Sequence, residues 1–336
     1  MNAMAAMRRL IVFAALVAAW LVACASPTGP GPATARHVPV VAYLGYTTSD
    51  VGAPYLGAFR QRLAELGFTD GRNVAVVERY AEGQYDRLGD LAAGLVRGGV
   101  DVLVTPGPGP TMAAMTATTT VPIVMLEAGD PVAYGLVKSL ERPGGNVTGV
   151  SSILSDLAPL HLDLLRRTVP GAMRVAVLWN PTNLAEQRLW GERQTTARVL
   201  GWQLQTVSVS AADQLDAALA TIAGGQVDAL YSVGDPLILS ERRRLADFAL
   251  AHRLPTVFGW REFVDAGGLM AYGPSTLALY RHAASYVARI LKGARPEDLP
   301  IESPEKYELV VNLKTARALG LTIPPAVVNA ADAVIQ

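Results

Sequence analysis

Cysteine is almost absent from this sequence of 336 residues, which contains Cys24 alone. A single cysteine cannot form an intramolecular disulfide, so the hydrophobic core has to stabilise the fold. Histidine is also scarce, and the histidines stand far apart without the spacing of metal ligands. They are His37, His161, His252 and His282. We therefore predict that the chain holds no metal.

Motifs of common nucleotide-binding and hydrolytic sites are missing as well. The sequence has no Gly-x-x-x-x-Gly-Lys-Ser/Thr loop, no Gly-x-Gly-x-x-Gly, no His-Glu-x-x-His and no Gly-x-Ser-x-Gly. Its 29 basic residues balance 29 acidic ones and form no basic block, which argues against nucleic acid as a partner. We predict no cofactor and no enzymatic activity, although a site made of dispersed residues would leave no motif.

The first 23 residues have the pattern of a secretion signal. Arg8 and Arg9 give a basic start, and residues 10–23 form an uncharged apolar run. The run is shorter than the ~20 residues of a membrane span and is typical of a signal peptide. It ends at Cys24, as in the lipobox of bacterial lipoproteins, although a lone cysteine is also a common core residue. We predict a signal peptide at 1–23 and a flexible tether at 24–37. Lipid on Cys24 would anchor the chain on the periplasmic or cell-surface side of a membrane.

Apolar runs typical of buried strands alternate with helical patterns along the rest of the chain. Strands are expected at 39–45, 73–80, 100–105, 122–126, 174–179, 202–207, 229–233, 256–258, 267–272 and 308–312. Helices are expected at 55–66, 86–97, 111–117, 132–140, 157–167, 184–200, 212–223, 240–252, 277–292 and 313–319. The alternation predicts an α/β fold with parallel sheets covered by helices.

The length after the tether is close to the ~250–300 residues at which a single core stops growing. We therefore predict two doubly wound parallel-sheet lobes joined by hinge crossings. The first lobe would comprise 38–148 and about 272–297, and the second 149–271 and about 298–336, with the placement of the tail left open. The Gly-rich residues 142–149 mark the first crossing, and the strand at 267–272 would return the chain to the first lobe.

Polar residues follow several of the expected strands, where open parallel sheets bind ligands. Asp130, Asn180 and Asp235 each come directly before a proline. Such a residue is also a good helix N-cap, and capping alone explains the pattern. The two roles are compatible, because a helix N-terminus attracts a carboxylate and an aspartate attracts an ammonium group. An amino acid or similar zwitterion is the ligand that this combination favours.

Aromatic residues lie near the same strand ends. Tyr43 and Trp179 fall within strands, where core packing is the simpler interpretation, and others lie closer to loops. The predicted ligand-binding residues are Tyr46, Thr47, Gly107, Pro108, Asp130, Asn180, Asp235, Trp260 and Tyr272.

Several segments together resemble the ABC transporter substrate-binding protein family, whose characterised members include tryptophan- and tyrosine-binding lipoproteins. The matching segments are GDPV at 129–132, RPGGNVTG at 142–149, DPL at 235–237, REFVDAGGLM at 261–270, ELVVNLKTA at 308–316 and LGLTIP at 319–324. The resemblance implies a type I periplasmic-binding-protein fold with three crossings. It also implies a small-molecule ligand held between the lobes of a monomer, and a permease with a cytoplasmic ATPase as partners.

One departure from the family concerns the loop after the third strand. Members of the family carry a Gly-Thr/Ser-Pro loop there, whereas residues 106–110 read PGPGP and offer no hydroxyl before Thr111. The departure puts an aromatic amino acid ligand in doubt. Two other functions stay open on the sequence, a ligand-sensing lipoprotein and an enzyme on the same fold.

Overall fold

The computed structural model describes residues 37–151, 157–232, 234–304 and 307–336. The predicted signal peptide, the predicted tether up to residue 36 and the predicted lipidation site Cys24 lie outside these ranges. None of the helices in these ranges combines the length and the apolar character needed to cross a membrane. Residues 39–336 form one compact unit.

The first sheet consists of five parallel strands in the order β2-β1-β3-β4-β5. Its strands are β1 (Val40–Gly45), β2 (Ala75–Tyr80), β3 (Val102–Pro106), β4 (Ile123–Leu126) and β5 (Val147–Val150). The apolar side chains of β1, β3 and β4 are almost wholly buried. This burial follows from helices on both faces, which leave no solvent-facing side for polar residues.

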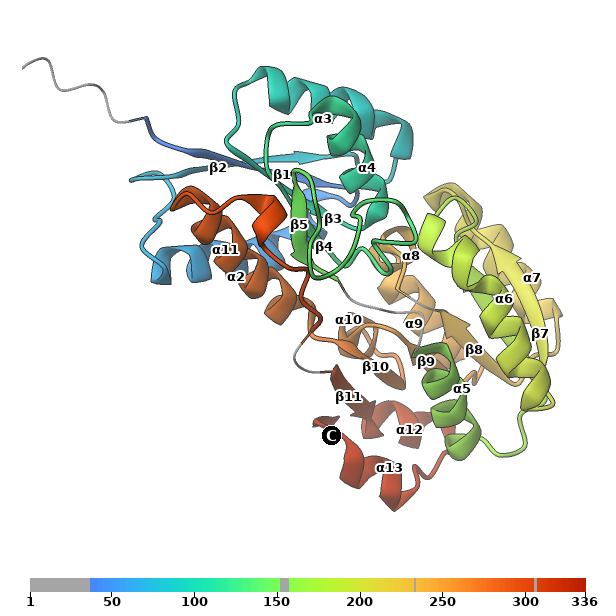
Figure 1. Ribbon diagram of the computed structural model, residues 1–336. Coiled ribbons are helices and arrows are strands. Elements are labelled where there is room, and N and C mark those ends of the chain that lie inside the picture. Colours follow the sequence, from blue (N-terminus) through green and yellow to red (C-terminus); the bar gives the residue numbers. More distant parts are fainter. Residues whose placement is uncertain (1–36, 152–156, 233, 305–306) are drawn as a thin grey trace, which may run out of the picture. The chain divides into compact units, whose positions relative to one another are not determined.

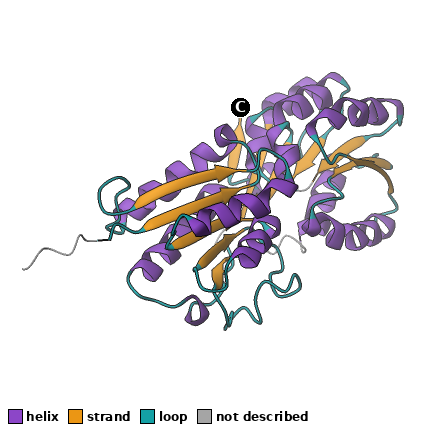
Figure 2. Ribbon diagram, turned by 90° about the horizontal axis from the view of Figure 1, so that it is seen from above, coloured by secondary structure: helices purple, strands orange, loops and turns teal. Residues whose placement is uncertain are grey.

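Helices cover the first sheet from two sides. They are α2 (Ser49–Glu65), α3 (Leu88–Arg97), α4 (Pro108–Ala117) and α11 (Thr276–Leu291), with a 3₁₀ turn η1 (Tyr85–Arg87) before α3. Figure 1 shows α3 and α4 on one face of this sheet and α2 and α11 on the other. The orange strands and purple helices of Figure 2 show the same layering from above. Leu56, Phe59 and Leu63 form the buried face of α2, at the spacing that the sequence predicted.

The second sheet has seven strands in the order β12-β11-β10-β9-β8-β6-β7. They are β6 (Arg174–Trp179), β7 (Gln203–Ser208), β8 (Ala229–Ser232), β9 (Thr256–Phe258), β10 (Met270–Pro274), β11 (Tyr307–Asn312) and β12 (Ala333–Ile335). Neighbouring strands are parallel except β10 and β11, which pair antiparallel. The predicted α/β fold with two helix-covered sheets is therefore confirmed, with one antiparallel pair that the alternation did not reveal.

The remaining helices belong to the part of the chain that builds the second sheet. They are α5 (Leu157–Thr168), α6 (Leu184–Val199), α7 (Leu215–Gly224), α8 (Pro236–Ser240), α9 (Arg242–Ala251), α10 (Arg261–Asp265), α12 (Leu313–Leu319) and α13 (Pro325–Ala330), with a 3₁₀ turn η3 (Ala212–Gln214). A further 3₁₀ turn, η4 (Pro296–Asp298), follows α11 and contacts β5 of the first sheet. Three stretches connect the two sheets along the chain: from β5 to α5, from β10 to α11, and from residue 302 to β11.

Three local predictions were wrong. The Gly-rich residues 142–149 are not the first crossing, because β5 pairs with β4 in the first sheet and the connection to the second sheet comes after it. The strand at 267–272 does not return the chain to the first sheet; β10 lies between β9 and β11 in the second sheet, and the next helix, α11, packs against α2. The helix predicted at 132–140 is a series of turns. Gly135 adopts a φ of 68° there, which a right-handed helix cannot contain.

Candidate functional site

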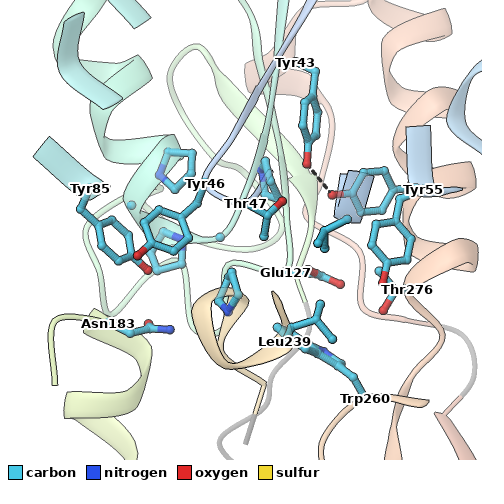
Figure 3. A pocket seen from close by; sticks show the side chains of 18 residues that line it. Tyr43, Tyr46, Thr47, Tyr55, Tyr85, Glu127, Asn183, Leu239, Trp260 and Thr276 are labelled. Carbon is cyan, nitrogen blue, oxygen red and sulfur yellow. Dashed lines mark hydrogen bonds between the residues drawn. The ribbon is translucent and has the colours of Figure 1, made fainter. Parts of the chain in front are cut away.

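A pocket lies where the strands of both sheets end. Its lining comprises Tyr43, Tyr46, Thr47, Val51, Tyr55, Tyr85, Pro106, Gly107, Pro108, Gly109, Pro110, Glu127, Asn183, Pro236, Leu239, Trp260, Thr276 and Tyr280. The space among these side chains is about 720 Å³, counting the open solvent at its mouth. Figure 3 shows the labelled side chains around this space.

The position of the pocket follows from the strand order. In the first sheet β1 lies between β2 and β3, and in the second β6 lies between β7 and β8. At such reversals the connections leave toward opposite faces, and the loops diverge to open a crevice at the carboxyl ends of the strands. Residues that follow β1, β3 and β4 meet residues that follow β6, β8 and β9 in the pocket lining.

Five of the predicted ligand-binding residues line the pocket. Tyr46 and Thr47 follow β1, Gly107 and Pro108 follow β3, and Trp260 follows β9. The Tyr46 hydroxyl donates to the Gly83 carbonyl at 2.6 Å, which fixes the ring at the pocket wall. The indole Nε1 of Trp260 is buried without a hydrogen-bond partner among the described residues.

Asp235 and Asn180 lie behind the lining and act within the protein. Asp235 is fully buried and caps α8, accepting from the Leu237 and Ile238 amides at 2.9 and 3.1 Å. Its other oxygen accepts from Asn183 Nδ2 at 2.7 Å, and Asn183 does line the pocket. Burial raises the pKa of Asp235 to about 6.

The fully buried Asn180 has a local role, since its Oδ1 accepts from the amide and hydroxyl of Thr182 at 3.0 and 2.7 Å. Capping and the bond to Asn183 account for Asp235, whereas the Nδ2 of Asn180 is buried without a hydrogen-bond partner among the described residues.

Asp130 and Tyr272 are not part of the pocket lining. Asp130 accepts from the Ala133 amide at 3.0 Å and so stabilises the turn after β4. Tyr272 lies in β10 and stacks on Tyr307 with the ring centroids 6.1 Å apart. The structure therefore brings five of the nine predicted residues together and places the other four elsewhere.

Tyrosines that the sequence did not single out dominate the pocket. Tyr85 stacks on Tyr46 with the centroids 3.8 Å apart. Gly109 makes room for this pair, because a Cβ there would come within 2.8 Å of the Tyr85 ring. On the other side Tyr280 of α11 shares a 2.8 Å hydrogen bond with Tyr43, and its ring lies 5.3 Å from that of Tyr55. Burial raises the pKa of each of these tyrosines, so they stay neutral.

Glu127, directly after β4, is the acidic residue of the lining. Its Oε1 is buried without a hydrogen-bond partner among the described residues. Burial, and then the nearby carboxylate of Glu262 on α10, raise the pKa of Glu127 to about 8. Burial also raises the pKa of Glu262, whose Oε2 is likewise buried and unpartnered within the described ranges. Figure 3 shows Glu127 between Tyr46 and Tyr55 in that view.

The loop between β3 and α4 offers few hydrogen-bond donors to a ligand. Gly107 adopts a φ of 81°, and the prolines at 106, 108 and 110 have no N–H. The Thr111 hydroxyl donates to the Gly107 carbonyl at 2.8 Å, shares a 2.9 Å bond with Thr105 and is buried outside the lining. The residues that the structure describes contain no cluster of three or more metal-ligating side chains.

The chain is similar to several proteins of known kind. The profile described as ABC transporter substrate binding protein matches residues 53–335. The chain is 27% identical over 263 residues to a tyrosine-binding protein of Clostridioides difficile, covering 78% of this chain and 75% of that protein. A crystal structure of a Streptococcus pneumoniae ABC domain in complex with L-Trp is 25% identical, with a TM-score of 0.82 over 89% of this chain and all of that one.

A conserved domain protein of Vibrio cholerae is 26% identical with a TM-score of 0.83, over 89% of this chain and all of that one. More distant structures share the type I periplasmic-binding-protein fold. One of them is a leucine-binding protein of Thermotoga maritima, with 16% identity and a TM-score of 0.57 over 76% of this chain and 83% of that one. The matched family consists of binding proteins rather than enzymes. On its fold and on the extent of the profile match, the chain belongs to the ABC transporter substrate-binding protein family.

Proposed function

We propose that this protein captures a small solute with an amino group in the pocket between its two sheets and delivers it unaltered to an ABC permease. The observation that carries the proposal is the lining itself, to which the strand ends of both sheets contribute. A ligand that contacts residues of both sheets stabilises the conformation in which both sets of residues touch it. A permease could then recognise the surface of that ligand-bound conformation. The tyrosine and tryptophan bound by the relatives, like the zwitterion inferred from the sequence, contain an ammonium group.

The proposed contacts are Tyr46, Thr47, Gly107, Pro108 and Trp260, joined by the lining residues that the sequence did not reveal. Asp235 and Asn180 would act indirectly: Asp235 holds Asn183 at the pocket wall, and Asn180 holds the loop after β6. For Asp130 and Tyr272 the contacts support structural roles only.

Lipid attachment at Cys24 is part of the same proposal, because a tethered monomer would keep the captured solute near the permease and its cytoplasmic ATPase. Its basis is the apolar run before Cys24 and the Pro- and Gly-rich stretch after it. Replacing Cys24 with Ala should abolish incorporation of labelled palmitate and release the protein from membranes. A variant that keeps the label would exclude this residue as the anchor.

The test of capture is native mass spectrometry of the protein gently purified from its own cells. We expect one unaltered small molecule per chain, lost on Tyr85→Ala and kept on Tyr307→Ala. Both tyrosines are partly buried and stacked on another tyrosine, but only Tyr85 lines the pocket. Melting temperatures of both variants establish that they fold. A chain that carries no solute, or converts what it is given, would contradict the proposal.

A further inference from the structure

We propose that the solute is an organic cation, a primary or quaternary amine without a carboxylate, held with its charge at Glu127 and its body among the tyrosines. The inference rests on the proposed function and narrows the solute from any amino-group compound to one chemical class.

The first argument is the charge of the lining. Among its eighteen residues Glu127 is the acid, and there is no lysine, arginine or histidine. A ligand carboxylate in this pocket would lose water and meet no cationic partner among the lining residues. An ammonium group would instead supply the partner that the buried Oε1 of Glu127 lacks.

The second argument is the scarcity of free backbone N–H groups at the start of α4. Helix N-termini bind carboxylates through free backbone N–H groups. At the start of α4, which faces the pocket, Pro108 and Pro110 have none, and the Thr111 amide is bonded to the Gly107 carbonyl at 3.4 Å. Gly109 alone keeps a free backbone N–H in this first turn, which is a poor site for a carboxylate.

The third argument is the aromatic wall. Five tyrosines and Trp260 line the pocket, and aromatic faces attract organic cations through the ring quadrupole. Tyr46 and Tyr85 lie at one side of the pocket in Figure 3, Tyr43 and Tyr55 at the other, with Glu127 between them in that view. A carboxylate among aromatic rings is the arrangement that recognises ammonium groups.

The backbone of Glu127 points to the same conclusion. Glu127 adopts a φ of 51°, a left-handed conformation that glycine adopts more easily than a residue with a side chain. This strained backbone conformation places the Glu127 side chain in the aromatic pocket, where its Oε1 has no hydrogen-bond partner among the described residues. Strained backbone conformations of this kind are frequent at ligand-binding sites.

Binding of a cation would displace a proton. The pKa of Glu127 lies at about 8, through burial and Glu262, so the empty pocket keeps this carboxyl protonated at neutral pH. The ionisable groups that face it are Glu262 on α10, Tyr43 on β1, Tyr55 on α2 and Tyr280 on α11, and all are neutral or acidic. Because the cation requires the ionised form, its affinity should fall up to about tenfold for each pH unit below 8 and level off above it.

The test uses two sets of three probes that share a body and differ in charge. One set is tyramine, L-tyrosine and 4-propylphenol; the other is choline, glycine betaine and 3,3-dimethylbutan-1-ol. Affinities are measured by titration calorimetry on the purified full chain at pH 6, 7, 8 and 9. In at least one set the cation should bind at least tenfold more tightly than both analogues, and its affinity should rise with pH up to about 8.

The variant Glu127→Gln removes the charge and keeps the shape, so it should weaken cation binding at least tenfold at pH 8 and abolish the pH dependence. Glu141→Gln is the matched control, because Glu141 is an exposed glutamate outside the lining. It should change neither the affinity for the cation nor the pH dependence of that affinity.

If the zwitterion binds most tightly in both sets, the cation inference is wrong and the proposed function stands. If the neutral analogue binds most tightly in both sets, the cation inference is wrong and so is the amino group in the proposed function, while capture of a small solute stands. If no probe binds, the solute found by native mass spectrometry decides: a neutral molecule or a carboxylate overturns the inference, and a cation supports it. If there is no solute either, the proposed function fails as well.

Discussion

Two regions of this protein bury carboxylates, and they treat the charge in opposite ways. On α6, Glu186 and Arg193 are 1% exposed each and form two hydrogen bonds, of 2.8 and 2.9 Å. At the pocket, Glu127 and Glu262 are partly buried, and each keeps one buried oxygen without a partner among the described residues. The first pair neutralises itself within the fold. At the pocket, Glu127 instead avoids the charge by staying protonated at neutral pH, and a bound cation would favour its ionised form.

The difference comes from local geometry. Residues seven apart on a helix lie on the same face two turns away, within reach of a long arginine side chain. Although burial lowers it, the carboxylate of Glu186 raises the pKa of Arg193 overall. Glu127 and Glu262 instead follow a strand and begin a helix in different parts of the chain, so no local arginine neutralises them. An acid paired within its own helix serves folding, whereas Glu127, unpaired at the pocket, can ionise when a cation binds.

The largest effect is expected for the buried ion pair of Glu186 and Arg193. Arg193→Leu leaves Glu186 buried without its cation, which should lower the free energy of unfolding by about 3–5 kcal/mol. Urea denaturation at pH 7 measures this loss. The double variant Glu186→Leu/Arg193→Leu should recover most of it, because two apolar side chains need no partner. A single variant as stable as the double one would show that the ion pair does not hold this region together.

The second-largest effect is expected at Glu127, the acid without a cationic partner among the lining residues of the pocket. Because the folded pKa of Glu127, about 8, lies above its ordinary value of 4.5, the folded state holds more protons than the unfolded state between these values. Stability should therefore fall as pH rises from about 4.5 to about 8. Glu127→Gln removes this loss and should stabilise the protein by up to about 3 kcal/mol at pH 7, and by less at pH 5. Denaturant midpoints at several pH values provide the measurement, and an equal effect at pH 5 and pH 8 would contradict the raised pKa.

Most of both sheets was predictable because a strand buried on both faces is a short continuous apolar run. The strand β5 was not predicted, since it has four residues and includes Gly149 after a Pro-Gly-Gly turn. Gly149 has a φ of 137°, and a Cβ there would collide with the backbone of Met125. This close approach of β4 and β5 is a property of the tertiary structure that no local pattern records.

The pocket was predictable in part. The rule that ligands bind at strand ends identified Tyr46, Thr47 and Gly107, because these residues directly follow β1 and β3. It missed Tyr280, which α11 brings to Tyr43 from 237 residues further along the chain. It also missed Glu127, three residues before Asp130. An acid before proline is recognisable from sequence as a helix cap, whereas a buried oxygen without a partner becomes visible only in the folded structure.

The third prediction separates capping from binding at Asp235. Asp235→Ala removes the acceptor of two α8 amides and of Asn183, and should cost about 1–2 kcal/mol of unfolding free energy. The matched variant Asp130→Ala removes one amide contact of a partly exposed turn and should cost less. Thermal and urea unfolding compare the two. A variant at Asp235 that loses all affinity for the solute at unchanged stability would assign this carboxylate to the ligand.

The smallest effect concerns a charge cluster in contact with water. Asp163 accepts from Arg166 and Arg167 at 2.6 Å each, on the partly exposed surface of α5. Burial raises the pKa of Asp163, but these two arginines lower it overall. Asp163→Asn should nevertheless lower the free energy of unfolding by less than about 1 kcal/mol, because water screens exposed ion pairs. The cost should shrink further in 1 M NaCl, where the Debye length is about 3 Å, whereas the loss in Arg193→Leu should persist. If both variants responded equally to salt, burial would not be what distinguishes the ion pair on α6.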